Sequence, residues 1–91
     1  MNAKERERQR HMRAIRSSGA DRWRLDALHT QMLEAEFEME WSRARRDRAG
    51  VYDPAETLPE REVAANRAYE KYKPARGEFL GALAKCAAVA A

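Results

Sequence analysis

The residues of this chain that are able to bind a metal ion are few and widely spaced. Asp26 and His29 are three residues apart, which places a carboxylate and an imidazole on one face of a helix. Glu36 and Glu40 follow on the same side. Di-iron helical bundles use paired Glu-x-x-His motifs, and this sequence contains no such motif. We therefore predict no metal site, and expect Glu36 and Glu40 to form a solvated acidic seam that pairs with Arg43.

Nucleophilic and phosphate-binding motifs are equally sparse. The single cysteine, Cys86, excludes an intrachain disulfide and lies in an alanine-rich segment with no histidine near it in sequence. The four glycines are scattered and do not form a phosphate-binding loop: Gly19, Gly50, Gly77 and Gly81. We therefore predict that the protein is not an enzyme and binds no cofactor.

The composition favours paired helices over a large globular core. At 91 residues the chain is predicted to be one domain, residues 1–91, and although 44% of it is apolar, Leu, Ile, Val and Phe together number only 12. This low content of large apolar residues is close to that of disordered chains. Disordered chains also have a high net charge, however, and the net charge here is only +3. A chain of this size buries only about 60% of its unfolded surface, so association, with a dimer favoured, is expected to stabilise it.

The helices that carry these residues are indicated by helix formers and breakers. Residues 1–18 form a charged N-terminal helix that ends at the Ser-Ser-Gly sequence of 17–19. Residues 20–49 contain no Pro, Gly, Val or Ile and are predicted to be one long central helix. Residues 50–58 form a loop, and Thr57 and Glu60 then match a capping box that begins the next helix.

The C-terminal helical segment contains Pro74, which either kinks the helix or begins a new one. Residues 86–91 are predicted to be a frayed tail, because alanine buries little apolar surface. The predicted fold is all-α: a small helical bundle or helical hairpin built on the long central helix.

The central helix contains the segment Leu33 to Trp41, LEAEFEMEW, in which apolar residues alternate with glutamates. Such alternation is typical of a half-buried strand, but no turn signal brackets the segment and no β-branched residue lies in it. On a helix, the same alternation places apolar residues on two separate faces with glutamates between them. We therefore predict a helix that contacts neighbours on two sides.

The two predicted faces of the central helix differ in character. The aliphatic face is expected to pack against the C-terminal helical segment and comprises Leu25, Leu28, Met32, Ala35 and Met39. The aromatic side is predicted to bind protein, because aromatic and arginine residues are enriched in interface hot spots; it comprises Trp23, Leu33, Phe37 and Trp41, rimmed by Arg45 and Arg48. The alternative is that these aromatic residues form the core of a three- or four-helix bundle.

The N-terminal basic residues support a rival function. Arginines there are able to make sequence-independent contacts with phosphates: Arg6, Arg8, Arg10, Arg13, Arg16, Arg22 and Arg24. A long helix that is apolar on two sides is a poor recognition helix, however, and interspersed glutamates dilute the basic charge.

We predict a small accessory or inhibitory protein that docks on a larger macromolecular partner without doing chemistry. The alternatives are a nucleic-acid-binding protein and a purely structural homodimeric bundle. The N-terminal sequence has no apolar run typical of a signal peptide, and no stretch approaches the roughly 18 apolar residues of a membrane span. A cytoplasmic location without membrane contact is therefore expected.

Overall fold

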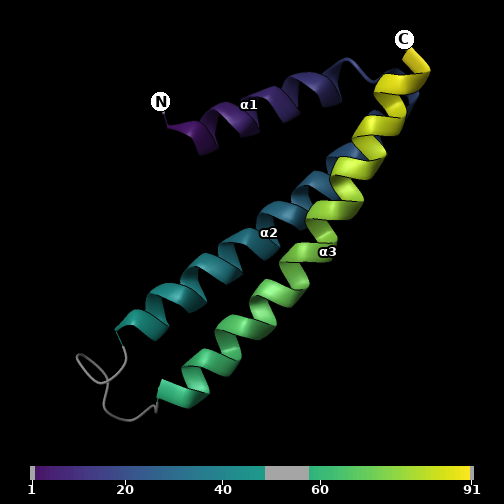
Figure 1. Cartoon of the computed structure of the whole chain (residues 1–91). Coiled ribbons are helices and arrows are strands. Elements are labelled where there is room, and N and C mark those ends of the chain that lie inside the picture. Colours follow the sequence, from purple (N-terminus) through teal and green to yellow (C-terminus); the bar gives the residue numbers. More distant parts are fainter. Residues whose placement is uncertain (1, 49–57, 91) are drawn as a thin grey trace.

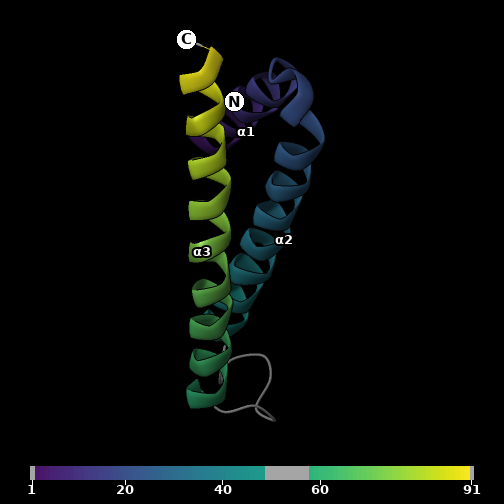
Figure 2. The same cartoon turned by 90° about the vertical axis from the view of Figure 1, so that its right-hand side faces the viewer.

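The computed structural model describes residues 2–48 and 58–90, and every regular element in these ranges is helical. The elements are α1 (Ala3–Arg16), a short 3₁₀ turn η1 (Gly19–Asp21), α2 (Arg22–Asp47) and α3 (Leu58–Ala90). Helices α2 and α3 run antiparallel as a hairpin (Figure 1), and α1 crosses the end of the hairpin where α2 and α3 separate (Figure 2). The predicted all-α helical hairpin is therefore confirmed.

The ends of α1 follow from its local sequence. Asn2 caps the N-terminus, since its Oδ1 accepts a hydrogen bond from the backbone N–H of Glu5 at 2.9 Å. Helix α1 ends at Arg16, and Gly19 then adopts a left-handed conformation with φ of 64°. Glycine adopts this conformation without steric cost. The turn that follows redirects the chain from α1 into α2.

The C-terminal helix is continuous. Helix α3 extends for 33 residues and includes Pro74, so the proline does not divide it into two helices. It is longer than the 26-residue α2. The segment 86–91, predicted to fray, is helical through Ala90. The predicted loop 50–58 and its cap at Thr57 lie outside the described residues, except for Leu58, which begins α3.

The hydrophobic core lies at the end of the hairpin that α1 covers. Phe79 of α3 is 0% exposed and is the largest fully buried side chain among the residues whose burial the structure describes. It packs in a cluster with residues from α1 and α2: Ile15, Leu25, Leu28 and Met32. Most of the partly buried residues packed against this cluster belong to α3, so the core is built mainly by the facing sides of α2 and α3.

At the other end of the hairpin, the contact between α2 and α3 is formed mainly by small side chains of α3. Met39 of α2 and two alanines of α3, Ala65 and Ala68, are buried there. Small residues at a contact allow two helices to approach closely. Arg61 is also buried, and its Nη1 donates a hydrogen bond to the backbone carbonyl of Arg45. This bond joins the beginning of α3 to the last turn of α2.

Candidate protein-interaction face

Three large aromatic side chains of α2 are exposed to solvent. The exposed fraction is 81% for Trp23, 71% for Phe37 and 52% for Trp41. Trp23 and Trp41 are about five helical turns apart, and Phe37 precedes Trp41 by about one turn, so all three lie on one side of α2. We call these three residues the aromatic face. The alternative in which they form a bundle core is wrong for the described structure.

The aromatic face is exposed because the opposite side of α2 already packs against α3. The buried side chains of that opposite side are those of the predicted aliphatic face: Leu25, Leu28, Met32 and Met39, with Ala35 half-buried. Leu33 departs from its predicted place, since it is half-buried and packs against the core cluster. Leu33 therefore supports the core, and the exposed site is purely aromatic.

Trp41 lies at the edge of a groove between α2 and α3. The guanidinium carbon of Arg45 is 5.2 Å from the centroid of the Trp41 ring, within the range of a cation–π interaction. The groove has a volume of about 220 Å³ and is lined by Trp41, Ser42, Arg45, Glu60, Arg61 and Ala64. Because Arg61 holds the Arg45 backbone, this groove is built on two helices that are fixed to each other.

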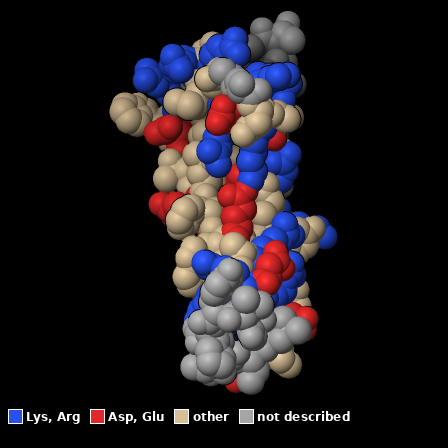
Figure 3. Space-filling model, turned by 90° about the vertical axis from the view of Figure 1, so that its left-hand side faces the viewer, with Lys and Arg blue, Asp and Glu red and all other residues tan. Residues whose placement is uncertain are grey.

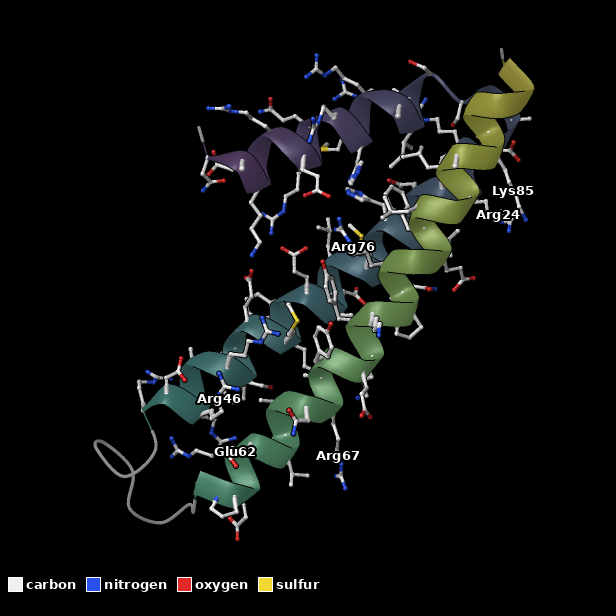
Figure 4. The ribbon with its side chains drawn as sticks, viewed as in Figure 1. Arg24, Arg46, Glu62, Arg67, Arg76 and Lys85 are labelled. Atoms are coloured by element: carbon white, nitrogen blue, oxygen red, sulfur yellow. The ribbon has the colours of Figure 1, made fainter. Side chains whose placement is uncertain are left out.

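The end of α2 beside Trp41 is basic. Arg45 and Arg46 lie in the last turn of α2, and the exposed Arg48 is its C-cap residue; Arg46 is seen at this end in Figure 4. Cations near a helix C-terminus are stabilised by the helix dipole. The structure thus places the predicted Arg45 next to Trp41 and the predicted Arg48 at the end of the same helix, so the aromatic group lies near a basic helix end.

Trp23 occupies a second location, near the joint between α1 and α2. It lines a hollow of about 190 Å³ together with Met12, Ile15, Arg16, Arg22 and Asp26. Trp23 is 14 positions before Phe37 in the sequence, which corresponds to about 21 Å along a helix. The aromatic face therefore has two parts, a pair at Phe37 and Trp41 and a single residue at Trp23.

The acidic seam of α2 is covered by α1, so the expected pairing with Arg43 is wrong. Glu36 is buried, and its Oε1 lies 3.3 Å from Lys4 Nζ and 3.2 Å from Arg8 Nη2. Lys4 also pairs with Glu40. Arg43 instead lies over the Tyr69 ring of α3, with its guanidinium carbon 5.5 Å from the ring centroid. The seam therefore attaches α1 to α2.

The predicted nucleic-acid-binding arginines do not all share one surface role. Arg8 pairs with the buried Glu36 of α2, although its own side chain is 45% exposed. The others are also exposed: Arg6, Arg10, Arg13, Arg16, Arg22 and Arg24. Arg24 lies near Lys85 at the end of the molecule where α2 begins (Figure 4). On the face that Figure 3 shows, acidic side chains are interspersed among the basic ones, so this face is not uniformly basic.

Replacing Glu36 with glutamine should loosen α1. The buried carboxylate has two cationic partners, and its loss leaves Lys4 and Arg8 facing a neutral amide. We expect backbone amides of α1 to exchange with deuterium at least several-fold faster in Glu36→Gln, as measured by mass spectrometry. Glu38→Gln is the matched control, because exposed Glu38 pairs only loosely with Lys71 at 3.6 Å and should contribute little. Equal exchange in the two variants would contradict a role for Glu36 in holding α1.

The structure brings together two histidines that the sequence did not connect. The ring centroids of His11 and His29 are 5.8 Å apart. The centroid of the Phe79 ring lies 5.0 Å from that of His11 and 4.9 Å from that of His29. Desolvation by burial lowers the pKa of both imidazoles below the ordinary 6.5. One sequence signal was available: His11 and His29 lie at similar distances on either side of Gly19, so helices folding back at that glycine bring them together.

Cys86 lies beside η1 and has the character of an unreactive thiol. Its Sγ is 3.6 Å from Asp21 Oδ2, to which it donates a hydrogen bond. Desolvation, together with this bond to a carboxylate, raises the pKa of the Cys86 thiol. A nucleophilic cysteine requires a lowered pKa, so its surroundings oppose formation of a thiolate.

Residues 2–48 and 58–90 offer neither a metal-binding cluster nor a membrane-spanning helix. Within these ranges, no group of three or more His, Cys, Asp or Glu side chains is arranged to hold a metal ion. Nor does any helix there have the length and apolar content needed to cross a membrane. Comparison with known proteins gives no match to a protein-family model, a curated protein or a solved structure. A function is therefore proposed from the geometry and chemistry of the chain itself.

Proposed function

We propose that this protein is a non-enzymatic binding protein that docks on a larger protein through the aromatic face of α2, centred on Phe37 and Trp41. One observation carries the proposal: these aromatic side chains are exposed although the chain has few large apolar residues and buries the opposite side of the same helix. Exposed Trp beside Arg is the composition of interface hot spots. A small accessory or inhibitory protein needs only such a binding surface and no catalytic group.

The chemistry of the rim indicates what kind of partner fits. Arg45 lies over the Trp41 ring, and Arg48 is the exposed C-cap residue at the same basic end of α2. A complementary surface has an apolar groove that accepts the aromatic rings and carboxylates that face the arginines. A second copy of this chain is the other candidate occupant of the face, and nucleic acid is the rival ligand of the exposed arginines on α1 and α2.

Affinity capture from the native host tests this proposal with matched variants. A protein that is retained by the wild-type chain should be lost with Phe37→Glu, because a buried carboxylate without a partner opposes docking. Val63→Glu introduces the same charge on α3, where Val63 is 49% exposed, and should retain the partner. Retention by both variants would contradict docking through Phe37.

Two solution measurements separate the rival occupants. Sedimentation of the purified chain at twice the mass of 10.5 kDa, reversed by Phe37→Glu, would assign the face to a second copy. Binding to single- or double-stranded nucleic acid that weakens steeply with salt and is unaffected by Phe37→Glu would favour the arginines as the functional surface instead.

A further inference from the structure

The joint between α1 and the α2–α3 hairpin is built around the chain's two histidines. His11 of α1 and His29 of α2 meet edge to face, and both rings contact Phe79 of α3, which is fully buried. Among the described residues, His11 Nδ1 and His29 Nε2 are buried and have no hydrogen-bond partner. The joint is therefore suited to two neutral imidazoles and offers no acceptor for a proton at these two nitrogens.

Polar contacts that surround this joint attach the rest of α1. Glu7 of α1 accepts a hydrogen bond from Arg76 Nη2 of α3 at 3.0 Å, and Arg76 lies on the side of α3 that faces α1 (Figure 4). Lys4 and Arg8 pair with Glu36 of α2. Beyond Ile15 and the histidines, α1 is thus held mainly by ion pairs. An ion pair that is exposed to solvent contributes little free energy to the docking of α1.

Charged groups of both signs face the histidines from all three helices. The acidic groups are Glu7 from α1 and Asp26 and Glu36 from α2; the basic groups are Arg8 and Arg10 from α1 and Arg76 from α3. The acidic groups favour protonation, and His11 Nε2 lies 3.9 Å from Glu7 Oε1. This pair lies within α1 and is kept when α1 is released, and in the docked state Glu7 also pairs with Arg76, while Glu36 pairs with Lys4 and Arg8. Protonation would add two further positive charges, with ring centroids 5.8 Å apart, beside Phe79.

We propose that α1 is a pH-responsive arm, docked on the α2–α3 hairpin while His11 and His29 are neutral and released when both are protonated. Release separates the two imidazolium rings, hydrates their N–H groups and uncovers the Phe79 side of the hairpin. This inference rests on the joint alone and is independent of the proposed protein-binding function.

The direction of the pH response follows from the pKa values. Burial lowers the pKa of both histidines in the docked state below 6.5, the value expected for a hydrated imidazole after release. The stabilisation of the docked arm is therefore fully present above pH 6.5 and is lost as the pH falls below it. With two protons taken up on release, the ratio of released to docked arm rises by up to about 100-fold per pH unit.

Distances between pairs of nitroxide spin labels test the proposal in the full chain. With Cys86 replaced by alanine, one pair joins Gln9 of α1 to Asn66 of α3, and a reference pair joins Thr30 of α2 to Asn66; all three labelled positions are exposed. Lowering the pH from 7.5 to 5.5 should lengthen or broaden the Gln9–Asn66 distance and leave the Thr30–Asn66 distance unchanged. An unchanged Gln9–Asn66 distance would overturn the proposal, as would equal changes in both pairs, which indicate general unfolding.

Histidine variants identify the groups responsible. The double variant His11→Leu/His29→Leu keeps apolar contact with Phe79 but cannot be protonated, so its Gln9–Asn66 distance should be the same at both pH values. Each single variant should take up at most one proton on release, which reduces the response to about 10-fold per pH unit. A transition of wild-type steepness in the single variants would assign the response to other groups and refute the role of the histidines.

Discussion

Phe79→Ala should lower the free energy of unfolding by about 3–5 kcal/mol, the cost expected for truncating a fully buried phenylalanine. Phe79 is 0% exposed and contacts all three helices through the core cluster and the rings of His11 and His29. The rest of the cluster is small, so its collapse into the cavity cannot restore these contacts. For a small domain with marginal stability, this loss is a large fraction of the total.

Urea denaturation followed by circular dichroism measures this effect, and the chain provides a matched control. Phe37 is its only other phenylalanine and is 71% exposed on α2. Phe37→Ala should change the free energy of unfolding by no more than about 0.5 kcal/mol, as is usual for surface positions. Comparable losses in the two variants would mean that Phe37 belongs to a core, and the aromatic face would no longer be available to a partner.

Trp41→Ala should weaken binding to the captured partner by at least about 2 kcal/mol, or roughly 30-fold in Kd, which is the scale of an interface hot spot. The substitution removes the indole that Arg45 covers and empties one edge of the groove between α2 and α3. Most of the change should appear as faster dissociation, because encounter is set by the remaining charges.

Titration calorimetry or surface plasmon resonance measures the change for Trp41→Ala. Trp23→Ala is the matched control, since it makes the same chemical change about 27 Å away along α2 and on an even more exposed residue. We expect less than about 1 kcal/mol for Trp23→Ala if docking is centred on Phe37 and Trp41. A larger loss for Trp23→Ala than for Trp41→Ala would move the centre of the interface to the joint with α1.

The positions of the helices were predictable because helix formers and breakers act locally. Residues 1–18 were predicted as the first helix, and α1 spans Ala3–Arg16; residues 20–49 were predicted as the central helix, and α2 spans Arg22–Asp47. The two apolar sides of α2 could also be predicted, because on a helix the alternation in residues 33–41 places apolar side chains on two separate faces. Its aliphatic side is buried and three aromatic residues are exposed.

The placement of α1 could not be predicted from local patterns. It depends on the left-handed turn at Gly19 and on pairs that are far apart in the sequence, such as Lys4 with Glu36 and Glu7 with Arg76. Without that placement, Glu36 was assigned to a solvated seam. Leu33 was misplaced for a related reason, since a residue between two faces of a helix is buried or exposed according to neighbours that the helix itself does not specify.

Docking of α2 on a protein through Phe37 and Trp41 can be tested by site-specific photo-crosslinking in the native host. A photoreactive phenylalanine analogue is placed separately at Phe37 and Trp41 on α2, and at Val63 and Arg67 on α3, all of them exposed positions. We expect one common crosslinked protein from positions 37 and 41 and none from positions 63 and 67. Crosslinks to a common protein from positions 63 and 67, with none from 37 and 41, would contradict it.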